Sequence, residues 1–243
     1  MLFRAEAQST LLSRYDSISS DTLQKETIRI FARLYCATKL SIDKGITEGD
    51  FSDTVFVQSF ENCFATYFWK AIDSPNVRTV GWRMAYIGDT SNCTVLQKLL
   101  LAINAHINDD LLKTYIAMGQ RYHIADYKVT AKRAGLRLVS VVDAVIGRYM
   151  QHYSEMSAYD KMQINIARKK IKRMIIRERN AIFDRYLEIA TGTDIATVLS
   201  RQEKVSKRYA TKVLHPKGLF RYFIKKLDRK YPMDKATLMN LIY

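Results

Sequence analysis

Side chains that could do chemistry gather in one short stretch, Asn104-Ala105-His106-Ile107-Asn108-Asp109-Asp110-Leu111, directly after the apolar run Leu99-Leu100-Leu101. In a helix, at about 100° per residue, His106, Asp109 and Asp110 lie on one arc. A neutral imidazole at the edge of an apolar core needs a partner for its protonated nitrogen, and either aspartate can supply one. The stretch therefore predicts a polar site inside a helix, with these candidate catalytic residues: Asn104, His106, Asn108 and Asp110.

A second histidine–aspartate spacing follows at His123 and Asp126. Helical bundles bind metals through carboxylates and histidines on facing helices. If the two segments pack antiparallel, the predicted ligands of zinc, iron or manganese are His106, Asp110, His123 and Asp126. The structural alternative for His106 is a buried hydrogen bond to aspartate that braces two helices. The structural alternative for Asp126 is a position near a helix N-terminus, where the helix dipole stabilises a carboxylate.

The two asparagines of the stretch, Asn104 and Asn108, stack one turn apart on another arc of the helix. Their amides can orient a substrate or simply cross-link neighbouring backbone. Both interpretations stay open at the level of sequence.

Scarce helix breakers, 3 prolines and 9 glycines in 243 residues, predict long helices and few tight turns. Apolar residues recurring every three or four positions predict helices over these approximate ranges: 21–45, 50–71, 82–87, 94–118, 124–150, 159–190, 194–214, 219–230 and 234–242. We therefore predict an all-α fold, a single-domain multi-helix bundle over residues 1–243 with a basic helical C-terminal layer.

The segment Thr191-Gly192-Thr193-Asp194 carries helix-stop and capping residues, with Asp194 as the predicted N-cap of the following helix. It predicts a subdomain hinge between a body, residues 1–190, that carries the histidine motif and the basic C-terminal helices, residues 194–243.

The net charge of +15 is concentrated in the C-terminal third. Residues 1–167 carry 19 basic and 17 acidic residues, whereas residues 168–243 carry 20 and 7. Such asymmetry indicates an anionic partner, either nucleic acid or an acidic membrane or protein surface, although a Lys/Arg-rich face is also ordinary solvated surface. The candidate nucleic-acid or anion-binding residues are Lys169, Lys170, Lys172, Arg173, Lys225 and Lys226.

The chain resembles an uncharacterised bacterial family of helical proteins, a domain of unknown function, whose signature is Asn-Ala-His-Ile-Asn-x-Asp-Leu after a Leu-rich run; residues 99–111 carry that match. Phe60-x-Asn62-x-Phe64, Trp82 and Asp126-Tyr127 are similar to further family positions, whereas Val129-Thr130-Ala131 replaces an expected Val-Asn. The resemblance covers about residues 50–145. It implies an all-helical fold and the importance of His106, and it implies no particular reaction.

The three cysteines, Cys36, Cys63 and Cys93, are far apart and lack Cys-x-x-Cys spacing, so we predict neither a disulfide framework nor a zinc knuckle. Residues 1–15 lack the apolar core of a secretory signal, and no window approaches 18 uninterrupted apolar residues. We therefore expect a cytoplasmic protein with no transmembrane segment.

Two classes of function fit these features. The first is a metal-dependent enzyme, a hydrolase or oxidase, that acts on an unidentified small molecule at the polar site. The second is a non-enzymatic binding protein whose C-terminal third engages nucleic acid or an acidic partner. No Gly-rich phosphate loop, Gly-x-Ser-x-Gly elbow or His-Glu-x-x-His motif is present, which argues against P-loop, esterase and zincin chemistry.

Overall fold

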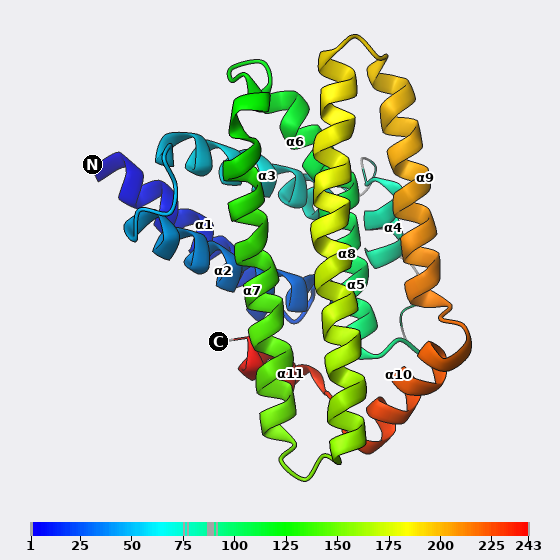
Figure 1. Ribbon diagram of the computed structural model, residues 1–243. Helices are drawn as coiled ribbons and strands as arrows, with labels where there is room; N and C mark the ends of the chain where they lie inside the picture. Colours follow the sequence, from blue (N-terminus) through cyan, green and yellow to red (C-terminus); the bar gives the residue numbers. More distant parts are fainter. Residues whose placement is uncertain (1, 75, 77, 87–89, 91, 243) are drawn as a thin grey trace.

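The computed structural model describes residues 2–74, 76, 78–86, 90 and 92–242, and all regular secondary structure within them is helical (Figure 1). This confirms the predicted all-α class. Among these residues, no helix has the length and apolar character needed to cross a membrane.

A helical rod forms the centre of the molecule. It consists of α5 (Val95–Ala105), a π-helical turn (His106–Asp110) and α6 (Leu111–Met118). Thr94 starts the rod with a capping box, because its hydroxyl accepts a hydrogen bond from Gln97 N while Gln97 Oε1 accepts one from Thr94 N. Most of the rod is buried on all sides, which explains the Leu-rich run that opens it.

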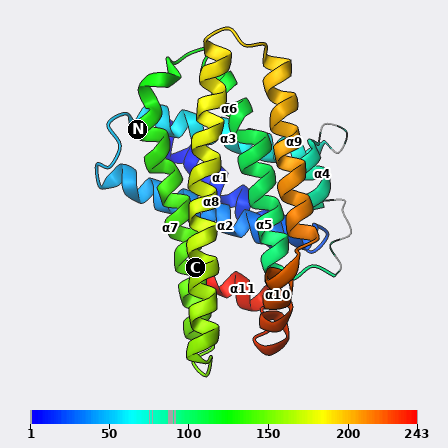
Figure 2. The same ribbon diagram turned by 45° about the vertical axis from the view of Figure 1, so that its right-hand side comes forward.

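Other helices enclose this rod. Helices α2 (Glu26–Thr47), α4 (Val80–Tyr86) and α9 (Ile195–Leu214) contact α5, whereas α3 (Thr54–Asp73) and α8 (Ala158–Ala190) contact α6. Helix α7 (Lys128–His152) packs against α2 and α8. In Figures 1 and 2, α7, α8 and α9 run side by side as long rods, with α1 (Leu2–Ser20), α2 and α3 crossing behind α7. Helices α10 (Gly218–Lys230) and α11 (Lys235–Leu241) lie at one end of these rods.

The predicted hinge coincides with the turn between α8 and α9. Gly192 has a φ of 105°, a left-handed conformation that a side chain rarely adopts. Asp194 is the N-cap of α9, as predicted, since its Oδ2 accepts a hydrogen bond from Thr197 N at 2.8 Å. Hinge motion at this turn stays a prediction.

Four differences separate the expected helices from the observed ones. Helix α1 was not expected, and α2 begins at Glu26 without a side-chain cap rather than near residue 21. The helix expected over 94–118 contains the π turn, and the one expected over 124–150 opens with a 3₁₀ turn (Ile124–Tyr127) before α7. Apart from α1, which was missed as a whole, these differences lie at helix ends or inside a correctly located helix.

Candidate functional site

The candidate site lies on the π turn in the middle of the rod. A π turn inserts an extra residue into an α-helix, is rare, and occurs frequently at functional sites. All five residues of this turn are buried, although three of them carry ionisable side chains. Because a buried polar group costs free energy unless it is hydrogen-bonded, the partners of each side chain indicate its role.

Asp110 and His106 form a buried pair. Asp110 Oδ2 lies 2.9 Å from His106 Nδ1 and accepts a hydrogen bond from Trp82 Nε1 on α4 at 2.8 Å. Asp110 thus holds Nδ1, which leaves Nε2 as the ring nitrogen of His106 that is open to another group.

Aromatic rings fix the orientation of His106. The Phe64 ring stacks on the imidazole with centroids 3.7 Å apart, and Phe31 and Tyr35 direct ring edges at it from 5.1 and 4.9 Å. His106 is only 2% exposed, and its Nε2 has no hydrogen-bond partner among the described residues. The surrounding aromatic rings therefore fix the direction in which His106 Nε2 points, although this nitrogen has no partner among the described residues.

His106 lines a small internal cavity with a volume of about 30 Å³. That space holds on the order of one or two water molecules. Two further acidic or basic side chains line the same cavity, Glu61 from α3 and Arg179 from α8. Most of the remaining wall is apolar: Phe31, Leu34, Phe60, Phe64, Ile103 and Leu138.

Arg179 is a buried cation without a partner. It is 8% exposed and makes no hydrogen bond or ion pair within the described part of the chain. Arg179 also lines a second pocket of about 230 Å³ between α7 and α8, whose rim includes the exposed residues Lys132 and Asn180. The Arg179 side chain thus stands between the enclosed cavity and the pocket at the surface.

Glu61 belongs to a buried ion-pair cluster. Its Oε2 lies 3.4 Å from Lys39 Nζ, and Lys39 is also paired with Asp43 one turn further along α2. Burial raises the pKa of Glu61 to about 8, against the opposing effect of the Lys39 ammonium. The Glu61 carboxyl thus keeps its proton to a higher pH than an exposed glutamate does, which makes it a candidate proton donor to the cavity.

Burial also shifts both members of the histidine–aspartate pair toward their uncharged forms. It raises the pKa of Asp110 to about 8, although the hydrogen bond from Trp82 opposes this shift. Burial, together with the positive charge of Arg179, holds the pKa of His106 well below its usual range. The main permanent charge facing His106 is thus the guanidinium of Arg179.

The predicted asparagines join the rod to α9. Asn108 Nδ2 donates to Asn104 Oδ1 at 3.0 Å, and Gln202 Nε2 donates to Asn108 Oδ1 at 2.9 Å. Asn104 Nδ2 donates in turn to the Ser206 carbonyl oxygen at 3.1 Å. Both amides are occupied by protein groups, which favours the cross-linking interpretation over direct contact with a substrate.

Asp109 anchors α4 to the rod. Its Oδ2 accepts hydrogen bonds from Gly81 N at 2.8 Å and from the Thr79 hydroxyl. Burial raises the pKa of Asp109 to about 6, which these hydrogen bonds oppose. A Cβ added to Gly81 would lie 2.5 Å from Asp109 Oδ2 and 3.0 Å from Ala105 Cα, so only glycine lets the two helices approach this closely.

The second histidine–aspartate pair does not join the first. His123 and Asp126 lie 3.2 Å apart on the segment that leads into α7, with side chains 80% and 73% exposed, whereas His106 and Asp110 are buried. Within the described residues, no three His, Cys, Asp or Glu side chains are grouped so that they could hold a metal ion. The predicted convergence of the four residues fails because His123 precedes α7 in an exposed turn instead of facing the rod.

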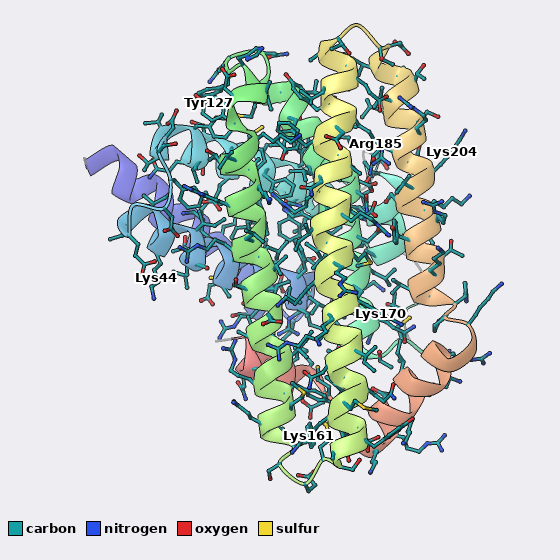
Figure 3. All side chains as sticks on the ribbon, viewed as in Figure 1. Lys44, Tyr127, Lys161, Lys170, Arg185 and Lys204 are labelled. Atoms are coloured by element: carbon teal, nitrogen blue, oxygen red, sulfur yellow. The ribbon has the colours of Figure 1, made fainter. Side chains whose placement is uncertain are left out.

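The six predicted anion-binding residues fall into different environments. Lys170 and Arg173 line a groove beside α8, where Figure 3 labels Lys170, and Lys169 and Lys225 are exposed. Lys172 instead pairs with Asp143 of α7 at 3.0 Å.

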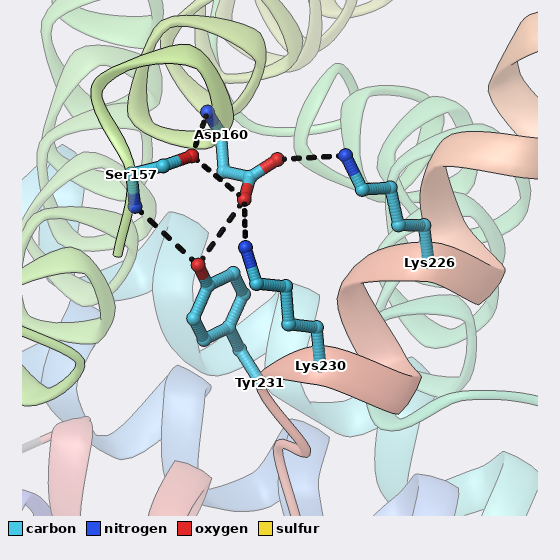
Figure 4. A network of polar contacts seen from close by, with 5 residues as sticks. All are labelled: Ser157, Asp160, Lys226, Lys230 and Tyr231. Atoms are coloured by element: carbon cyan, nitrogen blue, oxygen red, sulfur yellow. Dashed lines mark hydrogen bonds and ion pairs between the residues drawn. The ribbon is translucent and has the colours of Figure 1, made fainter. Parts of the chain in front are cut away.

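Lys226 serves a structural network shown in Figure 4. The buried Asp160 near the start of α8 accepts from Lys226 Nζ at 3.1 Å, Lys230 Nζ at 2.9 Å and the Tyr231 hydroxyl at 3.1 Å. These donors and Ser157 hold the pKa of Asp160 far below its usual range. Lys226 therefore contributes to fastening α10 onto α8.

Sequence reasoning missed Glu61 and Arg179 as site residues. Each carries a weak signal, because each interrupts an apolar helical stripe. Glu61 lies four residues from Val57 and from Ala65, and Arg179 follows Ile175 by four positions. A charge at such a position is buried, and a buried charge is a candidate for function.

Fold and site together define an all-helical protein with a buried polar centre on a π turn. The model of a family of unknown function, DUF5995, matches residues 9–216, and the chain belongs to this family. No curated protein and no solved structure matches the chain. This match confirms the predicted membership in a family of unknown function and extends beyond residues 50–145, over which the resemblance was noted.

Proposed function

We propose that the protein is an enzyme that binds a small organic anion through Arg179 and transfers a proton at His106. One observation carries the proposal: His106 Nε2 and the Arg179 guanidinium line the same cavity, and neither has a hydrogen-bond partner among the described residues. An unpaired buried ion costs several kcal/mol of stability in real proteins. A bound anion offsets that cost at Arg179 and brings a reacting group to His106.

The surroundings of Arg179 favour a carboxylate as the anion. A guanidinium binds a planar carboxylate through two parallel hydrogen bonds. The aromatic and aliphatic wall, which includes Phe31, Phe64 and Leu138, suits the carbon skeleton of a small organic acid. Because Arg179 also lines the surface pocket between α7 and α8, that pocket is the proposed approach for the ligand.

The division of labour in the site follows from its contacts. Asp110 orients the imidazole through Nδ1, which makes Nε2 the atom that exchanges a proton with the substrate. Glu61, protonated near neutral pH, is the second proton donor in the cavity. Asn104, Asn108 and Asp109 act as positioning residues, since they hold the π turn against α9 and α4.

A divalent metal stays a prediction within this proposal. His106 Nε2 and Glu61 are the two side chains of this cavity that zinc, iron or manganese accepts as ligands, and Asp110 would orient the histidine from behind. The positive charge of Arg179 opposes a further cation beside it, so we favour proton transfer without a metal. Elemental analysis of the wild type and His106→Ala distinguishes the two possibilities. Near-stoichiometric metal in the wild type that is lost in the variant would favour a metal-dependent enzyme over proton transfer without a metal.

Small carboxylates test the anion site directly. We expect formate or acetate to raise the melting temperature of the wild type, since ligand at 100 times its Kd stabilises by about 2.7 kcal/mol. The same titration of Arg179→Met should give no shift. Lys169→Met, which removes an exposed cation from the same helix, should respond like the wild type. Equal responses in all three proteins, or no response in any, would rule out a carboxylate site at Arg179.

A further inference from the structure

A wide groove runs between α8 and α9, away from the His106 cavity. The groove has a volume of about 1520 Å³. One wall is formed by α8 between Gln163 and Arg177, and the other by α9 and the turn after it, between Lys204 and Lys217. Figure 3 labels Lys170 on α8 and Lys204 on α9.

The rims of this groove are strongly basic. Among the side chains that the structure describes, eight lysines and arginines line it, and no aspartate or glutamate does. Of the eight, Arg177 pairs with Glu178 at 3.0 Å, and the other seven make no ion pair with the described residues. The full set is Lys170, Arg173, Arg177, Lys204, Lys207, Arg208, Lys212 and Lys217. Such a concentration of unneutralised charge attracts a polyanionic partner.

The floor of the groove is apolar rather than charged. Ile166 is 43% exposed there, which is a large aliphatic side chain left in water between two rows of cations. The apolar lining is Leu100, Ile166, Ala167, Ile171, Met174, Val213 and Pro216. An occupant of this groove must therefore combine acidic edges with an apolar face.

We propose that the groove binds an acidic amphipathic helix of a partner protein. Such a helix places its apolar face on the floor and its aspartates and glutamates against the two cationic rims. The α8 wall from Gln163 to Arg177 is about 21 Å long at 1.5 Å per residue, which matches a helix of about four turns. A second copy of this chain is a less favourable occupant, because its net charge of +15 opposes its approach to a basic groove.

Nucleic acid fits the same cations less well. Single strands bind by stacking bases on aromatic rings, and among the described side chains Tyr209 is the one Phe, Tyr or Trp that lines the groove. The Tyr209 hydroxyl donates to Glu178 at 2.6 Å, which holds its ring against α8. A duplex binds through its phosphates and gains nothing from an aliphatic floor.

A designed peptide tests the proposal. The probe is a fluorescent 18-residue helix with leucines at i, i+3, i+4 and i+7 and glutamates on both flanks, compared by anisotropy with a shuffled peptide of the same composition. We expect the amphipathic peptide to bind at least about tenfold more tightly than the shuffled one. Lys170→Glu with Lys207→Glu, and separately Met174→Gln, should each weaken binding by about tenfold. Lys169→Glu, one residue away on α8 and outside the groove, should change it by less than about twofold.

Four results would overturn the proposal. Equal affinity for the shuffled peptide would show that the groove attracts acidic peptides through charge alone. No binding of either peptide at 0.15 M salt would show that the groove is not a docking site for an acidic helix. Tighter binding of duplex or single-stranded DNA, lost in the Lys170→Glu, Lys207→Glu variant, would make the surface a nucleic-acid site. The same dependence with phosphatidylserine vesicles would make it a membrane contact. Circular dichroism of each variant confirms that the helices are retained.

Discussion

Replacing Arg179 with methionine should make the protein more stable while removing its response to small carboxylates. Arg179 is 8% exposed as a residue and has no hydrogen-bond or ion-pair partner among the described residues, and burial lowers its pKa because the charged form is disfavoured. Replacing buried charges by apolar side chains of similar volume often stabilises proteins by about 1–4 kcal/mol. Methionine fills the space of the arginine stem, so we expect a gain in that range. In a chain of this size each kcal/mol raises the melting temperature by about 2–4 °C.

Urea denaturation followed by circular dichroism at pH 7 measures this change. Lys169→Met on the same helix is the matched control, because an exposed substitution shifts stability by no more than about 0.5 kcal/mol. A loss of about 2 kcal/mol or more in Arg179→Met would refute the reasoning. It would mean that Arg179 stabilises the fold, so that no ligand is needed to explain its burial.

Three further substitutions have defined outcomes. Gly135→Ala places a Cβ 2.5 Å from Arg179 Nε, so it should abolish the carboxylate-induced thermal shift with little change in the melting temperature of the free protein; an unchanged ligand response would contradict this. Gly81→Ala should cost about 1–3 kcal/mol of unfolding free energy in urea, because the methyl group meets Asp109 and the rod backbone, and a cost under 0.5 kcal/mol would show that α4 moves freely. Glu61→Gln tests the raised pKa of Glu61, which is about 8 in the folded protein against 4.5 for a free glutamate. Between these two values the folded state keeps a proton that the unfolded chain releases. The free energy of unfolding of the wild type should therefore fall relative to that of the variant, by up to about 1.4 kcal/mol per pH unit between pH 5 and 8. A difference that does not vary with pH would be inconsistent with a protonated Glu61.

The helices could be predicted because their signals are local. Apolar spacing located the long elements, and Asp194 capped α9 as expected, because a cap depends on a side chain and an amide three residues apart. The π turn could not be predicted in this way. It depends on contacts from Trp82, Gly81 and Gln202, which lie far from His106 along the chain.

The candidate site was predicted in part for the same reason. The His106–Asp110 pair lies within one helical turn, so the sequence indicated it. Glu61 and Arg179 reach the cavity from two other helices, and only tertiary packing brings them beside His106. The exposure of His123 likewise depends on where α7 begins, which the spacing of residues does not determine.

The nitrogen spectrum of His106 tests the central claim most directly. The chain has four histidines and His106 is the buried one, so ¹⁵N-labelled histidine gives it a distinct signal. We expect that the His106 signal does not titrate near the usual imidazole pKa of about 6.5, since burial and Arg179 hold its pKa well below that value. Adding acetate should move the Nε2 signal of the wild type and leave that of Arg179→Met unchanged. A His106 signal that titrates near pH 6.5, or an Nε2 signal that ignores acetate, would contradict a ligand site shared by His106 and Arg179.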